Sequence, residues 1–195
     1  MYPMDMIHGQ PAGNLAAMMR HLVRATELES DHEGLTPLQW SALQYLGLAN
    51  GISRTVSGFA AYNATSKGTA SQVIKSLVDK DLVKRVRRPR DARSAELVLT
   101  AGGQRLVEEG GDGHLATAIG ALSDADRQHL EAVMTTLMGQ LRAPRGRVQL
   151  GSCHDCCHLD ARNGAPLCCR TGSRLDEAEL TSLCAAHTPS ESRRD

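Results

Sequence analysis

The chain has 195 residues, of which 41% are hydrophobic but only 3% are aromatic, and its formal net charge is zero. This length accommodates one full domain and an appendage, with an interior built mainly from aliphatic side chains, which favours helix over strand. A neutral chain has no global field to attract a polyanion, so any such site must be local. Because the chain opens without a basic segment followed by an apolar run, and contains no membrane-length apolar stretch, we expect a cytoplasmic protein.

The first two expected helices differ in how clearly they begin. Residues 14–29 show an apolar stripe at helical spacing. The N-terminus of the second helix is more clearly marked. Thr36 suits the N-cap, Pro37 fits the first helical position, and Gln39 completes a capping box. This helix should end at the turn-forming residues 50–51.

A short helix over 53–62 leads to another over 66–78, and the two faces of this later helix differ. One face is apolar. The other face carries hydroxyls, an amide and lysines but no acidic residue, which is unusual for a helix that only faces water. Its residues are Lys67, Thr69, Ser71, Gln72, Lys75 and Ser76. Small polar side chains near a helix start can closely approach the major groove of DNA.

A basic β-hairpin is expected next, with strands at 82–88 and 95–99 and a turn at 89–94. Residues 51–100 contain ten basic and four acidic side chains, a local excess of six positive charges in a neutral chain. An arginine at a hairpin tip is narrow enough to enter a minor groove. This segment is therefore a candidate contact for a polyanion.

Two more helices should follow the hairpin, one from Ala101 with a break at 110–113 and a last long one opened by Ser123. Residues 143–150 then form a linker. We expect a domain at 12–142, this linker, and a cysteine-rich tail at 151–189.

The order helix, short helix, polar-faced helix and basic hairpin is typical of a winged helix-turn-helix. Residues 35–107 resemble the MarR family of bacterial regulators, and 12–142 do so with the flanking helices. The motifs are Leu35-Thr36-Pro37-Leu38-Gln39-Trp40, the helix 66–78, and Arg90-Asp91-Ala92-Arg93-Ser94 before Leu97-x-Leu99-Thr100. The resemblance implies a mainly α fold with a small β-hairpin wing (α+β), and a homodimer formed by the N- and C-terminal helices. It also implies a nucleoid-associated, non-enzymatic regulator that binds a palindromic operator in double-stranded DNA.

The residues expected to contact DNA lie on the polar helix and on the hairpin. The helix supplies Ser66, Lys67, Thr69, Ser71, Gln72 and Lys75, the wing tip supplies Arg90 and Arg93, and Arg87 and Arg88 are expected at phosphates. Asp91 could hold the wing tip by pairing with Arg93.

The tail is set apart by its cysteines: all six lie between Cys153 and Cys184, and the preceding 152 residues contain none. In a reducing compartment such clustering indicates metal ligands or redox groups rather than structural disulfides. Cys153 and Cys156 have the spacing that lets both bind one centre from a tight turn. We also expect Ser173 to cap a helix in which Leu180, Leu183, Cys184 and His187 share one face.

Two ligand sets remain open. An all-cysteine set of Cys153, Cys156, Cys168 and Cys184 suits a 4Fe–4S cluster, and resembles small cluster-binding tails, which favours Cys168 as the third ligand. A mixed set of Cys153, Cys156, Cys184 and His187 suits zinc (Zn2+). The alternates Cys157 and Cys169 are spare in both sets, and His158 is a candidate hydrogen-bond donor to a cluster sulfur.

Three functions follow from these sets. The first is a regulator whose cluster senses redox state, oxygen or iron. The second is a regulator that responds to a small phenolic or lipophilic ligand and has a structural zinc tail, and the third, more remote, is a thiol oxidoreductase using Cys153 and Cys156. Since the tail has few large apolar residues, we expect metal ligation to be needed for it to fold.

Overall fold

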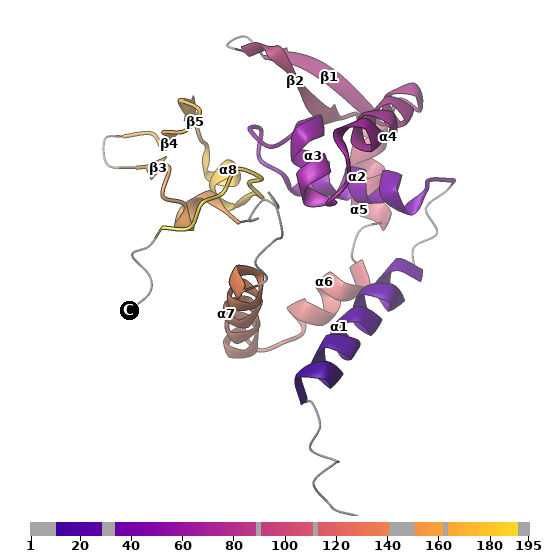
Figure 1. Ribbon diagram of the computed structural model, residues 1–195, viewed down its shortest axis with the longest axis vertical. Helices are drawn as coiled ribbons and strands as arrows, with labels where there is room; N and C mark the ends of the chain where they lie inside the picture. The colour runs from indigo at the N-terminus through magenta and orange to yellow at the C-terminus, as the bar shows by residue number, and fades with distance from the viewer. Residues whose placement is uncertain are drawn as a thin grey trace, which may run out of the picture.

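The computed structural model describes residues 11–28, 34–88, 91–110, 113–140, 151–161 and 164–190. Its described residues between 34 and 110 form a winged-helix core. Residues 11–28 and 113–140 are helices that lie below this core in Figure 1, and residues 151–190 form a small unit beside it, hereafter the tail module. The expected mainly helical fold with a small antiparallel wing is confirmed.

Three capped helices build the winged-helix core: α2 (Pro37–Leu48), α3 (Val56–Tyr62) and α4 (Lys67–Asp79). The predicted capping box is present at α2, where the Gln39 backbone N–H donates to Thr36 Oγ1 and the Thr36 N–H donates to Gln39 Oε1. Thr55 and Ser66 cap α3 and α4. Each helix therefore starts where a side-chain oxygen can satisfy an unpaired backbone N–H.

The interior of the core is aliphatic with a small aromatic group. Its largest fully buried side chains are Tyr45, Phe59, Leu43, Leu46, Ile74, Leu77, Leu97 and Val83. Tyr45 packs between Phe59 and Tyr62, with ring centroids 6.0 and 4.9 Å away. These residues come from all three helices and from both wing strands, so one core fixes the orientation of α4 relative to the wing.

The wing is an antiparallel pair of β1 (Val83–Arg88) and β2 (Asp91–Leu99). The register runs from Val83 opposite Leu99 to Arg87 opposite Ala95, and then shifts between Arg87 and Arg88. The prediction that residues 91–94 belong to a turn was wrong, because this irregularity accommodates the extra residues and lets strand pairing resume.

The remaining helices are α1 (Pro11–Leu28), α5 (Ala101–Gly110), α6 (Gly113–Gly120) and α7 (Asp124–Gln140). The helix expected from Ala101 is described in two parts, α5 ending at Gly110 and α6 beginning at Gly113. Large apolar side chains are exposed along α1 and α7, namely Leu15, Met18, Met19, Leu22 and Val23 on the first, and Leu130, Val133, Met134 and Leu137 on the second. Within the described residues, no helix combines the length and the apolar character that crossing a membrane requires.

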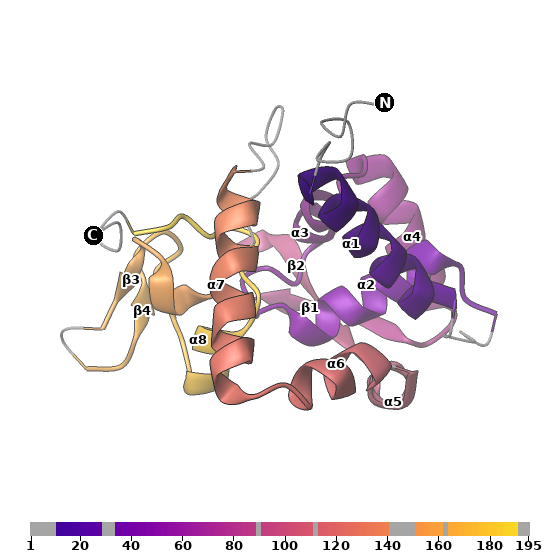
Figure 2. The same cartoon turned by 90° about the horizontal axis from the view of Figure 1, so that it is seen from below.

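The tail module consists of short elements held together by backbone hydrogen bonds. They are η2 (Cys153–Asp155), a three-stranded antiparallel sheet of β3 (Leu159–Asp160), β4 (Leu167–Cys168) and β5 (Ser173–Arg174), and α8 (Glu177–Thr181). The start and end of the module meet where Gly151 pairs with Cys184 and Cys156 with Pro189. Figure 2 shows the module on the side of α7 away from α1.

The expected helix capped by Ser173 was wrong. Ser173 lies in β5, and α8 is instead capped by Asp176. The helix ends at Thr181, before Cys184 and His187, because the backbone of the next residues forms bonds elsewhere: the Leu183 N–H donates to Leu48 O (2.8 Å) and the Cys184 N–H donates to Gly151 O (2.8 Å).

Candidate functional site

The polar face of α4 is open to solvent. Ser66, Lys67, Thr69, Gln72 and Lys75 are exposed, Ser71 is half-buried, and the opposite face buries Ala70, Ile74 and Leu77 in the core. The Ser66 hydroxyl accepts the Thr69 N–H at 3.0 Å. That hydroxyl therefore also fixes the first turn of the helix, while the longer side chains can project outward.

The wing places further basic side chains beside this helix. Lys84, Arg85 and Arg87 are exposed on β1. Arg88 and Arg93 belong to the two strands, but their side chains lie outside the described residues, as do Arg90 and the proposed ion pair of Asp91. The linker 143–150 likewise lies outside them. Figure 1 shows the hairpin projecting from the core on the side away from α1 and α7.

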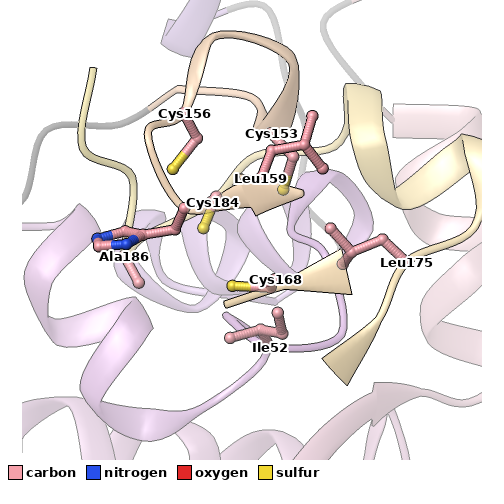
Figure 3. Close-up of a pocket in the computed structure, with 9 residues that line it drawn as sticks. Ile52, Cys153, Cys156, Leu159, Cys168, Leu175, Cys184 and Ala186 are labelled. Carbon is pink, nitrogen blue, oxygen red and sulfur yellow. The ribbon is translucent and has the colours of Figure 1, made fainter. Parts of the chain in front are cut away.

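Four cysteines line one pocket in the tail module: Cys153 from η2, Cys156 after it, Cys168 from β4 and Cys184 after α8. Figure 3 shows their sulfur atoms gathered around the same space. The rest of the lining is mostly aliphatic, with Ile52, Leu159, Leu175, Ala186 and one imidazole, His158. All six cysteines of the chain are free thiols.

The other candidate ligands are not among the residues that line this pocket. Cys157 and Cys169 are exposed. The buried His187 directs its Nε2 towards Asp155 Oδ1, 3.1 Å away, and its ring packs so closely on Gly151 that a Cβ there would be 2.6 Å from Nδ1. Among the described residues, His187 Nδ1 has no hydrogen-bond partner.

The chemistry of the pocket suits a thiolate-bound centre. Burial raises the pKa of Cys153 to about 11, with smaller contributions from Cys184, Cys156 and Cys168, while a hydrogen bond from Asn50 opposes the shift. Several thiolates cannot share an apolar pocket without a compensating cation, which an iron–sulfur centre or zinc supplies.

A zinc site places a tight requirement on the spacing of its ligands. Four sulfurs around zinc lie about 3.8 Å apart, as follows from Zn–S bonds of about 2.3 Å in a tetrahedron. Across the described ranges, no group of three or more His, Cys, Asp or Glu side chains is arranged to hold a single metal ion.

The pocket also includes residues of the winged-helix core that the sequence analysis missed. Ile52 lines it, and the Asn50 amide Nδ2 donates to Cys153 Sγ at 3.7 Å. Both belong to the loop between α2 and α3, whose Asn50-Gly51 pair indicated only the end of a helix. No local signal could have shown that this loop meets the tail.

Residues 33–94 match the model of the MarR family. Similar solved structures include a MepR variant from a multidrug-resistant S. aureus clinical isolate (TM-score 0.53, 24% identity, covering 69% of this chain and 99% of that chain). A MarR/EmrR family transcriptional regulator from Acinetobacter sp. ADP1 has a TM-score of 0.51 at 19% identity, covering 66% and 94%.

S. aureus MepR in a complex with DNA has a TM-score of 0.50 at 22% identity, covering 65% of this chain and 97% of that chain. Among curated proteins no significant sequence match was found. Residues 33–94 thus carry the MarR-family sequence pattern, and the chain has the winged-helix fold of such regulators.

Proposed function

We propose that this protein is a DNA-binding transcriptional regulator of the MarR type whose tail module binds a 4Fe–4S cluster and senses redox state, oxygen or iron. One observation carries the sensing part: the four cysteines of the all-cysteine set, which come from three separate places in the tail, line a single pocket. The proposed DNA part rests on the winged helix and its charge.

Double-stranded DNA fits the exposed surface of α4 and the wing. The first turns of α4 present Lys67, Thr69 and Gln72 without an acidic neighbour, and β1 adds exposed basic side chains. Small polar groups can reach base edges in the major groove, while lysine and arginine neutralise phosphates. S. aureus MepR, which has a similar fold, has been solved in a complex with DNA.

A homodimer is supported by the apolar stripes of α1 and α7. Met18 is 67% exposed and Leu15 60% exposed, and both lie on a helix that continues this stripe to Val23. Contiguous exposed apolar faces of this kind mark association surfaces. A second copy of the chain covering them would place two α4 helices on the two halves of a palindromic operator.

The all-cysteine ligand set is favoured over the mixed set by two features of the tail. His187, which the mixed zinc set requires, lies outside the pocket lining and faces Asp155. Cys168, which only the all-cysteine set requires, lines the pocket, whereas its neighbour Cys169 is exposed. His158 borders the same space and could donate to a cluster sulfur.

The DNA proposal is tested by replacing the wing arginine. Operator duplexes are selected from a random-sequence pool with the full-length protein, and their affinity is measured by fluorescence anisotropy at several salt concentrations. Arg93→Ala should weaken binding by roughly tenfold, which is the effect of losing one groove contact. Unchanged affinity at physiological salt would remove the wing from the interface.

The sensing proposal is tested by metal analysis of protein purified without oxygen. A brown sample with iron and sulfide and broad absorption near 400 nm (roughly where thiolate-bound clusters absorb) would establish a cluster. A colourless sample with about one zinc per chain, as a four-ligand structural site requires, would replace the sensing role by a structural one. The signal would then be sought among small phenolic or lipophilic ligands.

A further inference from the structure

The tail module is joined to the winged-helix core by backbone hydrogen bonds. Leu183 donates its N–H to Leu48 O at 2.8 Å and accepts the Asn50 N–H at 2.9 Å, which makes a short parallel bridge. The Leu183 side chain also packs against the hydrophobic core. We call this contact between residues 48–53 and residues 179–185 the docking seam.

Two more bonds fix the docking seam on either side of Leu183. The Ala185 N–H donates to Ser53 Oγ at 2.9 Å, and the Gly51 N–H donates to Glu179 Oε1 at 3.3 Å. The loop between α2 and α3 is therefore held along its length by the segment that carries Cys184. Such a loop cannot rearrange without breaking several of these bonds at once.

Asn50 occupies the centre of the docking seam and has no solvent exposure. Its side chain uses both of its polar ends: Oδ1 accepts the Ser53 N–H at 3.0 Å, and Nδ2 donates to Cys153 Sγ at 3.7 Å. A buried amide is costly unless both ends are satisfied. One of the two partners of this amide is a candidate ligand sulfur.

The same loop is bonded directly to the wing. Four residues after Asn50, the Arg54 carbonyl accepts the Leu97 N–H at 2.8 Å, and Arg54 Nε donates back to Ala49 O at 2.9 Å. The Arg54 guanidinium also lies 3.9 Å from a Glu96 carboxylate oxygen. A movement of the loop at Asn50 is therefore passed to β2 through a single residue, Arg54.

We infer that Asn50 is the positioning residue through which the winged helix responds to the state of the thiol site. This inference rests on the proposed metal-bound tail. A metal-bound Cys153 sulfur carries negative charge and accepts a charge-assisted hydrogen bond from Asn50, which holds the loop and the start of the wing strand in place. Loss or oxidation of the centre takes the charge from that sulfur, which leaves a weaker acceptor and so weakens the hold on the loop.

Hydrogen exchange on the full-length protein tests the inference, with the stripped chain reconstituted by iron and sulfide. In the wild type, stripping should speed exchange of the Leu97 amide by about tenfold, since a hydrogen bond to a charged group is worth about that factor. Asn50→Asp keeps a side-chain oxygen for the Ser53 N–H, which the Asn50 backbone carbonyl also accepts, but removes the amide donor. In that variant, and in Asn50→Ala, exchange in the loaded protein should already be fast.

Asn63→Ala is the matched control, because Asn63 Nδ2 also donates within the winged helix, to Ser41 Oγ at 2.9 Å. It should keep the wild-type difference between loaded and stripped protein. The reduction potential gives a second readout that a purely structural role does not move: losing a donor to a ligand sulfur should lower it in both Asn50 variants.

The outcomes separate the two proposals. If Asn50 variants load iron and keep the wild-type exchange difference and potential, the inference is wrong while the metal site stands. The same holds if loaded and stripped wild-type protein exchange alike at Leu97. If the wild type binds no metal at all, the proposed sensing function fails, and this inference fails with it.

Discussion

The winged-helix core and the tail module are stabilised in different ways. The core buries a continuous set of aliphatic and aromatic side chains from α2, α3, α4 and the wing. The described part of the tail module buries Cys153, Leu175, Cys184 and His187, so two of its four buried residues are thiols. Apolar burial is therefore enough to fold the core, whereas we expect the tail to depend on the proposed metal centre.

Removing one ligand should have the largest effect and should be confined to the tail. Cys153→Ser takes away a buried sulfur from the pocket, and we expect complete loss of metal and rapid proteolysis within 151–189. Metal analysis and limited proteolysis with mass spectrometry measure both. The winged-helix core should remain protected, because its own burial does not involve the tail thiols.

Cys169→Ser is the control for this experiment, since Cys169 is an exposed thiol next to the pocket residue Cys168. It should keep the full metal content and the wild-type cleavage pattern. Retention of metal by Cys153→Ser would remove Cys153 from the ligand set. Equal loss from both variants would show that the number of thiols matters rather than their placement.

A cavity in the core should destabilise the winged helix and leave the metal content of the tail unchanged. Leu43 has no solvent exposure, and Leu43→Ala should lower the free energy of unfolding by about 3 kcal/mol through lost burial and the space left behind. Urea denaturation measures this change. Metal content at temperatures where the variant is folded should stay at the wild-type value, because Leu43 does not line the pocket.

Leu48→Ala serves as the matched change on the same helix. The Leu48 side chain is 54% exposed, so we expect an effect within about 0.5 kcal/mol, even though its carbonyl belongs to the docking seam. Similar destabilisation by both substitutions would contradict the packing described for α2.

The same contrast explains what could be predicted from the sequence. Helix starts such as Thr36 were predictable because an N-cap bonds residues three positions away. The gathering of Cys168 with Cys153 was suggested by resemblance alone, since no local rule connects residues so far apart. The face proposed to bind DNA was likewise suggested by patterns within single elements, namely the polar side chains of α4 and the basic residues of the wing.

The sequence-based predictions failed where tertiary hydrogen bonds outweigh the local helical periodicity. Leu180, Leu183, Cys184 and His187 have helical spacing, but α8 stops at Thr181 because the Leu183 backbone pairs with the α2–α3 loop. The role proposed for Asn50 was equally invisible, because its sulfur partner lies 103 positions along the chain.

The same helix-capping device is used in both regions, and removing it should destabilise the protein less than the cavity at Leu43 does. Capping boxes begin α2, at Thr36 and Gln39, and α8, at Asp176 and Glu179. Thr36→Ala should lower the free energy of unfolding by about 1 kcal/mol, and Thr36→Ser should restore it, because α2 unfolds with the whole core. Asp176→Ala removes the corresponding N-cap hydrogen bond from α8, a five-residue helix that we expect to open locally. It should speed hydrogen exchange in α8 and at Gly51, whose N–H donates to Glu179. The urea midpoint of the core should not move. A shift of that midpoint as large as that of Thr36→Ala would mean that the tail module and the winged helix unfold as one unit.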